Sequence, residues 1–173
     1  SGFSASQLKA AGATVKMLLE AGFRVKQLKS IGCTANEFKQ CDCTAEELRD
    51  AGFTANELRQ VGYDAVQLRN GGFLARQLRD VGFLPADLKM AGLTALELED
   101  VGFSAKELKE GGFTTEDMMS AAFTAQELRL AGCTVEELKP AGMTLKELKD
   151  GGFSISELKA ANFPAWKMKE VGL

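Results

Sequence analysis

Histidine is missing from all 173 residues of this chain. Because histidine is the commonest general base and the commonest side-chain metal ligand, its absence disfavours most hydrolases and zinc enzymes. No apolar run approaches the roughly 18 residues that a membrane-spanning helix needs. We therefore expect a soluble, non-enzymatic protein with no catalytic residues, no cofactor, no bound metal and no membrane insertion.

Cysteine is scarce, with four thiols at Cys33, Cys41, Cys43 and Cys133. Three of them cluster, and clustered thiolates can hold a metal ion. All four, however, replace apolar residues of the repeated pattern described below, and free cysteine usually behaves as a small buried hydrophobe. We interpret them as core residues, with a Cys33–Cys43 disulfide as an alternative. So few cysteines are not typical of secreted disulfide frameworks and favour a reducing compartment.

An excess of basic charge is also absent, since the formal net charge is −3. Lys or Arg does recur every ten residues, as at Arg49, Arg59 and Arg69, and such a ladder could follow nucleic-acid phosphates. Acidic residues are interleaved with it, so the summed field is not that of a nucleic-acid binder. We expect no nucleic-acid partner and interpret the bases as solvated side chains that complement helix dipoles.

A ten-residue repeat accounts for nearly the whole chain. Seventeen complete copies follow the phrase A-G-F-T-A-x-E-L-K-x, and the copy Ala51–Gln60 is close to the ideal. We number its columns from one to ten, so that Phe53 lies in column three. A short fixed period predicts units that must stack on neighbours to bury their apolar faces. We expect one continuous domain over residues 1–173, with residues 161–173 as an atypical C-terminal cap.

Columns four and seven predict where each helix begins. Column four is Ser or Thr in twelve of seventeen copies, and column seven is Glu or Gln in thirteen. Thr54 with Glu57 therefore forms the capping-box pattern, in which each side chain binds the other residue's backbone N–H. Columns one, five and eight are apolar and share one helical face. The pattern indicates a new helix every ten residues.

Column two predicts where each helix ends. It is Gly in fifteen of its eighteen occurrences, which suits a left-handed residue directly after a helix. The aromatic residue of column three, such as Phe53, would then fold back on the last helical turn, as in a Schellman motif. The fold class that we expect is all-α, a solenoid of about seventeen two-turn helices.

A longer period of forty residues is visible in the exceptions. Doubled glycines occur at 71–72, 111–112 and 151–152, which are four repeats apart. We interpret this spacing as roughly four helices per superhelical turn, with equivalent positions stacked from one coil to the next.

The first half of each repeat suggests an alternative fold. A-G-F-T-A resembles a unit of the pentapeptide-repeat family, whose right-handed β-helix places Leu or Phe at its centre and a small residue two positions earlier. In the second half the corresponding small position is column six, which holds Lys16, Glu46, Arg76 and Trp166. Side chains of this size do not fit a narrow β-helix, so the β-helix stays the alternative to the helical solenoid.

Function is sought in side chains that depart from the repeat. Several apolar residues stand in columns that are otherwise polar, and aligned exposed apolar residues mark partner surfaces. These candidates are Leu19, Leu74, Leu84, Met90, Leu96, Met119 and Leu130. Met90 and Leu130 are forty residues apart and would stack on one side. The one Trp, Trp166, is either a lid on the last repeat or a partner anchor.

These features favour a structural scaffold or linker subunit that binds other proteins within a multi-subunit assembly. A repeat-based ligand- or polymer-binding module is the alternative, because the polar columns recur at a regular spacing.

Overall fold

The computed structural model describes residues 2–172, and all of their regular secondary structure is helical. The helices are α1 Ala5–Ala10, α2 Val15–Glu20, α3 Val25–Ser30, α4 Ala35–Lys39, α5 Ala45–Asp50, α6 Ala55–Gln60, α7 Ala65–Asn70, α8 Ala75–Asp80, α9 Pro85–Met90, α10 Ala95–Asp100, α11 Ala105–Glu110, α12 Thr115–Ser120, α13 Ala125–Leu130, α14 Val135–Leu138, α15 Leu145–Asp150, α16 Ile155–Ala160 and α17 Ala165–Glu170. Each repeat thus supplies one helix. The predicted all-α solenoid is confirmed, and the β-helix alternative is wrong because residues 2–172 contain no strand.

The helices begin at capping boxes, as predicted. The Thr54 N–H donates to the Glu57 carboxylate at 2.7 Å, and the Glu57 N–H donates to the Thr54 hydroxyl at 3.2 Å. Where column four is apolar, half of the box survives, since the Leu74 N–H still donates to the Gln77 side chain at 2.8 Å. Isolated helices of this length are unstable, so the caps and the stacking of repeats together maintain them.

The helices end in Schellman motifs. The Phe53 N–H donates to the Leu48 carbonyl at 2.9 Å, and the Gly52 N–H donates to the Arg49 carbonyl at 2.7 Å. Gly52 has a φ of +90°, which is comfortable for a residue without a side chain. The three column-two residues that are not glycine keep this left-handed conformation, including Ala122 with a φ of 58°. We call the four residues between one helix and the next, columns one to four, a corner. The left-handed conformation in each corner therefore belongs to the position and not to glycine alone.

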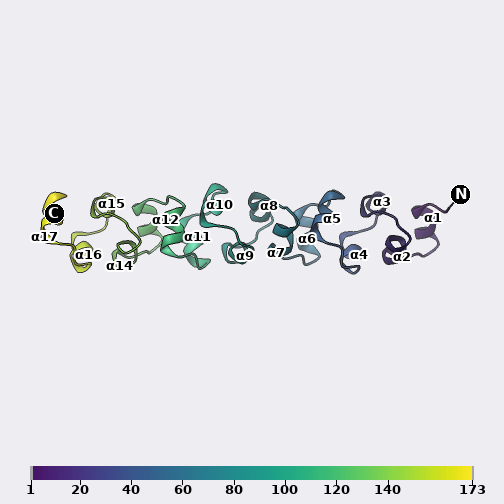
Figure 1. Ribbon diagram of the computed structural model, residues 1–173, viewed down its shortest axis with the longest axis horizontal. Helices are drawn as coiled ribbons and strands as arrows, with labels where there is room; N and C mark the ends of the chain where they lie inside the picture. The colour runs from purple at the N-terminus through teal and green to yellow at the C-terminus, as the bar shows by residue number, and fades with distance from the viewer. Residues whose placement is uncertain (1, 173) are drawn as a thin grey trace. The chain divides into compact units, whose positions relative to one another are not determined.

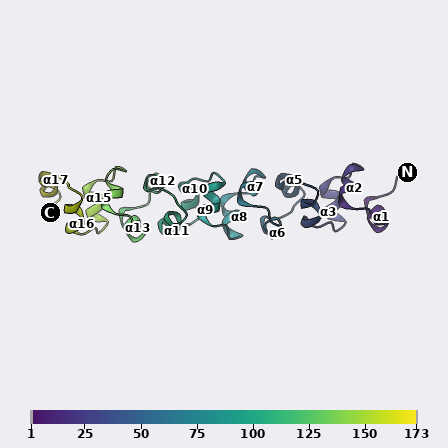
Figure 2. The ribbon, with the colours of Figure 1, turned by 90° about the horizontal axis from the view of Figure 1, so that it is seen from below.

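The chain divides into two compact units, Ser1–Phe83 and Leu84–Leu173. Helices that are one or two repeats apart pack together within each unit, as do α3 with α5 in the first and α10 with α12 in the second. In Figure 1, α3 and α5 lie along one edge of the first unit, and α2 and α4 lie along the other. Figure 2 shows α10 and α12 opposite α11 and α13 in the second. Our expectation of a single domain over residues 1–173 stays a prediction.

The turn of the solenoid is shorter than predicted. The Lys29 ammonium binds a carbonyl 23 residues later, the Lys139 ammonium one 22 residues later, and Lys109 binds a carboxylate 28 residues later. A turn therefore takes between two and three repeats, and the expectation of roughly four is wrong.

The doubled glycines are explained by tight local packing and not by a coil of four repeats. A Cβ atom added to Gly71 would lie 2.7 Å from the Ala45 Cβ, and one added to Gly151 would lie 2.4 Å from the Ala125 Cβ. Neither distance leaves room for a methyl group. The first glycine of each pair thus lies where a corner packs tightly against a helix of an earlier repeat.

The core consists of columns three, five and eight. Leu48 and Leu58 in column eight are fully inaccessible, and Phe53 and Ala55 are also buried. Full burial of a Leu or Phe side chain contributes about 1.5–3 kcal/mol, so these columns supply most of the driving force for stacking. No described helix is long and apolar enough to cross a bilayer.

Candidate functional site

The bases of column nine tie distant repeats together. The Lys109 Nζ donates to the Gly132 carbonyl at 2.6 Å, and the Arg129 Nε donates to the Gly151 carbonyl at 3.0 Å. The same link recurs from Lys29, Arg59, Lys89, Lys139 and Lys149. These acceptors lie at the ends of helices, where backbone carbonyls lack partners within the helix. The ladder is therefore structural, and our interpretation of it as merely solvated is wrong.

Several of these bases also cover an aromatic ring. The Lys29 ammonium lies 4.1 Å from the Phe53 ring centre, and the Lys39 ammonium lies 4.4 Å from that of Tyr63. Such cation–π contacts add attraction between the two repeats. Sequence reasoning missed them, although the constant spacing of 24 residues between columns nine and three was an available signal.

Column-seven acids take part both in the helix caps and in ion pairs with column-nine bases of earlier repeats. The Lys109 ammonium lies 3.2 Å from the Glu137 carboxylate, and Lys89 lies 3.7 Å from Asp117. The hydrogen bond from the Thr134 backbone lowers the pKa of Glu137 most, with Lys109 adding to the effect. The acids most regular in the sequence are thus committed to holding the fold.

All four cysteines are free thiols. Cys33, Cys43 and Cys133 are buried, as expected for core residues, and Cys41 is half-buried. Burial raises the pKa of Cys43 to about 11. The described residues contain no group of three or more His, Cys, Asp or Glu placed to hold a metal ion.

Six of the eight predicted partner-binding residues have exposed side chains. Their exposed fractions are 65% for Leu74, 66% for Leu84, 73% for Met90, 48% for Leu96, 67% for Leu130 and 64% for Trp166. Leu19 and Met119 are only half-buried, so their expected exposure is wrong: column nine lies against the next layer of the stack. Phe3, Met17, Val66 and Ile155 are exposed as well, and sequence reasoning missed them.

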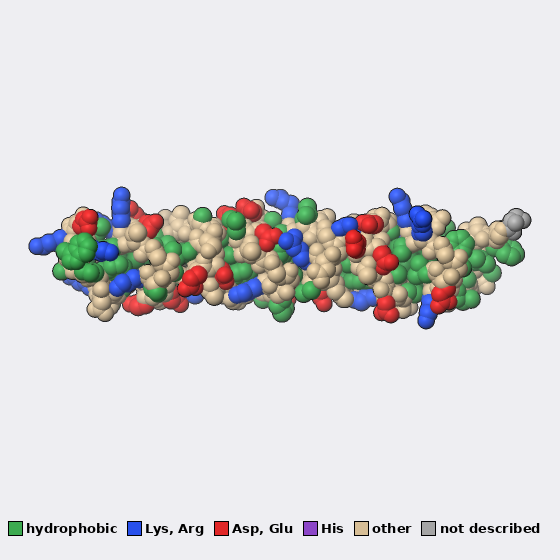
Figure 3. Space-filling model, viewed as in Figure 1, with side chains coloured by type: hydrophobic (Ala, Val, Ile, Leu, Met, Phe, Trp, Pro, Cys, Tyr) green, Lys and Arg blue, Asp and Glu red, His purple; other side chains and the backbone are tan. Residues whose placement is uncertain are grey.

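Met90 and Leu130 both belong to the second unit, and our expectation that they stack on one side stays a prediction. In Figure 3, green apolar areas on the visible face are separated by charged side chains and backbone. Trp166 is too exposed to be a lid, because a lid would bury its indole against the end repeat.

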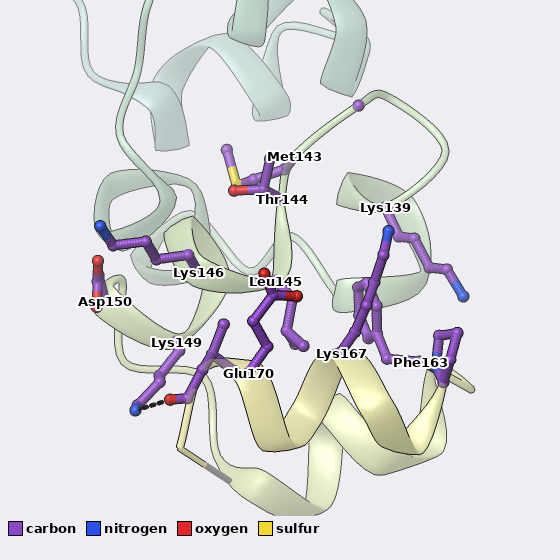
Figure 4. A pocket seen from close by; sticks show the side chains of 13 residues that line it. Lys139, Met143, Thr144, Leu145, Lys146, Lys149, Asp150, Phe163, Lys167 and Glu170 are labelled. Carbon is purple, nitrogen blue, oxygen red and sulfur yellow. Dashed lines mark hydrogen bonds between the residues drawn. The ribbon is translucent and has the colours of Figure 1, made fainter.

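Three grooves in the second unit occupy equivalent places in the repeat. Each lies between the corner and helix of one repeat and the helix two repeats later. The C-terminal groove, between α15 and α17, has a volume of about 810 Å³, with Met143 and Phe163 in its lining (Figure 4). The middle groove, between α13 and α15, measures about 520 Å³, and the α10–α12 groove about 430 Å³.

A comparison with protein families gives one result. The family described as the decapeptide repeat region matches residues 1–63, 52–125 and 122–173. No curated protein and no solved structure matches the chain significantly. Because the three matches together span the chain and its period is ten residues, the chain belongs to the decapeptide repeat family.

Proposed function

We propose that this chain is a non-enzymatic structural scaffold or linker subunit that binds other proteins within a larger assembly. The observation that carries the proposal is the set of large apolar side chains left in water. Met90, Leu96 and Leu130 in the second unit are 48–73% exposed, although most residues of their columns are polar. Burying such a side chain against a partner would contribute about 1.5–3 kcal/mol before the costs of association.

The use of the remaining residues supports the same function. Column-four hydroxyls accept backbone N–H groups, column-seven acids complete the caps, and column-nine bases bind carbonyls two repeats away. These polar columns maintain the frame, which leaves the exposed exceptions as the variable part of the surface. A rigid frame with variable exposed positions is typical of repeat proteins that bind other proteins.

The alternative, a ligand- or polymer-binding module, would need free hydroxyls along column four. The Thr54 hydroxyl instead lies 2.8 Å from the Glu57 carboxylate and also accepts the Glu57 N–H. Retention of the whole chain on a polysaccharide resin at about 0.15 M salt, where weak surface electrostatics are screened, would favour this alternative.

The test compares two sets of substitutions in the full chain. Met90→Ser, Leu96→Ser and Leu130→Ser together remove the exposed apolar side chains of the second unit. Glu20→Ser, Asn36→Ser and Gln60→Ser make a matched control at exposed polar positions of the same columns in the first unit. We expect proteins that co-purify with the native chain to be lost from the triple variant by about tenfold and kept by the control. Equal recovery with both variants would contradict the proposal.

A further inference from the structure

The C-terminal groove differs in charge from the other two. Four lysines line it, Lys139, Lys146, Lys149 and Lys167, against the two acids Asp150 and Glu170. The middle groove is lined by Glu147 and Asp150 with no base, and the α10–α12 groove by one base and one acid. In a chain of net charge −3, the largest groove is therefore the most basic of the three.

Substitutions in the last repeat explain the difference. Pro164 stands in the capping column, and α17 begins without a side-chain cap. Column seven therefore needs no acid for a capping box, and it holds Lys167 where the middle groove has Glu147. The exchange puts a positive charge where the middle groove has a negative one.

The four ammonium groups that line the groove differ in their partners. Lys139 donates to the Ala161 carbonyl at 2.7 Å, and Lys149 donates to that of Val171. Within residues 2–172, by contrast, Lys146 and Lys167 make no ion pair or hydrogen bond, and the Lys167 ammonium lies 5.6 Å from the Trp166 ring centre. Lys167 extends from α17 into the opening, while Lys146 lies on its far side beside Asp150 (Figure 4).

Apolar side chains also line the groove. They are the buried Met143 and Leu145 and the half-buried ring of Phe163, and the exposed Trp166 adjoins Lys167 in α17. A ligand that fits would therefore combine negative charge with an apolar group, a combination that a protein segment can supply and a phosphate chain alone cannot.

We propose that the C-terminal groove binds a short acidic segment of a partner protein. One apolar side chain of the segment lies against Met143 and Phe163, and its carboxylates pair with Lys146 and Lys167. The segment also covers part of Trp166. This inference rests on the proposed protein-binding function and adds a second contact surface, with the chemistry of its partner.

Peptide binding to the full chain tests the inference. The probe is an array of extended peptides of about nine residues, in which acidic, basic and apolar positions vary independently, so that no sequence is presumed. The strongest ligand is then labelled, its affinity is measured by fluorescence anisotropy, and emission from the sole Trp reports contact at Trp166. We expect peptides with at least two acids and one apolar residue to dominate, and their affinity to fall as salt rises.

A variant that restores residues used elsewhere in the repeat provides the decisive comparison. Lys146→Gln with Lys167→Glu gives the groove the side chains found at Gln126 and Glu147 in the middle groove, so the fold should tolerate both changes. We expect the Kd to rise at least tenfold, as for the loss of two charge-assisted contacts. Lys16→Gln with Lys26→Glu makes the same charge change at exposed positions of the first unit and should leave the Kd unchanged.

Three outcomes would overturn the inference. They are array binding that does not depend on acidic residues, an unchanged Kd in the groove variant, and tighter binding of a single-stranded oligonucleotide than of any peptide. The Met90, Leu96 and Leu130 triple variant should bind the peptide normally. If the triple variant binds the peptide normally and also keeps its co-purifying proteins, the proposal about the apolar contacts is contradicted. The proposal that the groove binds an acidic segment is then unaffected.

Discussion

The Lys109 Nζ donates a 2.6 Å hydrogen bond to the main-chain oxygen of Gly132, which lies 23 residues later. The oxygen belongs to a corner, and the ammonium belongs to the helix end over which that corner packs. The pair therefore joins one layer of the second unit to another. Since equivalent links recur in both units, column nine acts as a series of ties along the stack.

Loss of one tie should destabilise the fold measurably. Lys109→Met keeps most of the side-chain volume but removes the donor to Gly132 and the ion pair with Glu137. We expect the free energy of unfolding to fall by about 1 kcal/mol, because the Gly132 carbonyl loses a charged donor at a partly exposed site. Urea denaturation measures the change. Lys106→Met is the control, since it removes only an exposed pair with Glu110 and should cost less than about 0.5 kcal/mol.

A methyl group at the first residue of a glycine pair should be poorly tolerated. In Gly151→Ala the new Cβ would lie 2.4 Å from the Ala125 Cβ and 2.8 Å from its carbonyl carbon, so the backbone must move. We expect a loss of about 1–3 kcal/mol in urea denaturation. Adding Ala125→Gly should recover part of the loss, because one of the two clashing methyl groups is then absent. A neutral single variant would show that the corner is less tightly packed than described.

Replacing Ala122 by glycine should stabilise the folded protein. Its φ is 58°, a conformation that costs a residue with a Cβ about 1–2 kcal/mol and costs glycine little. Ala122→Gly should therefore stabilise the protein by up to about 1 kcal/mol and raise the Tm. Ala121→Gly is the control: its φ is −86° and its side chain is buried, so this change should lower the Tm.

Lowering the pH should reduce the stability of the protein, because the carboxylates of the capping boxes become protonated. For six of them the pKa in the folded protein lies below the ordinary value of 4.5 because the carboxylate accepts hydrogen bonds from the cap residue: Glu37, Glu57, Glu127, Glu137, Glu147 and Glu157. A lowered folded-state pKa means that the stabilisation is present above about pH 4.5 and is lost as the pH falls through the folded-state pKa. Urea denaturation between about pH 7 and pH 3 should show the loss.

A single capping acid can be isolated from this pH dependence. Glu137→Gln should lower stability at neutral pH and make the decline in acid shallower, because one titrating carboxylate has been removed. Glu136→Gln, at a neighbouring acid outside the capping box, should alter the pH profile less. Identical profiles for the two variants would contradict the assignment of the effect to the cap.

The sequence by itself determined the helices and their ends. Thr54 with Glu57 and Gly52 with Phe53 are local signals, because the hydrogen bonds that they predict close within six residues. The burial of columns five and eight was also readable, since it follows from apolar spacing on a short helix, whereas column one, expected on the same face, is mostly half-buried. The exposure of most apolar exceptions followed from the same pattern.

Only the tertiary structure decided how the repeats stack. The number of repeats in a turn depends on small backbone rotations at each corner, and the same ten letters are compatible with several such rotations. For this reason the partners of Lys109, the contact between Gly151 and Ala125, and the half-burial of Leu19 and Met119 were not predicted. The C-terminal groove depends on the same geometry, because Lys146 and Lys167 lie 21 residues apart in the sequence and meet across one opening only after α17 stacks beside α15.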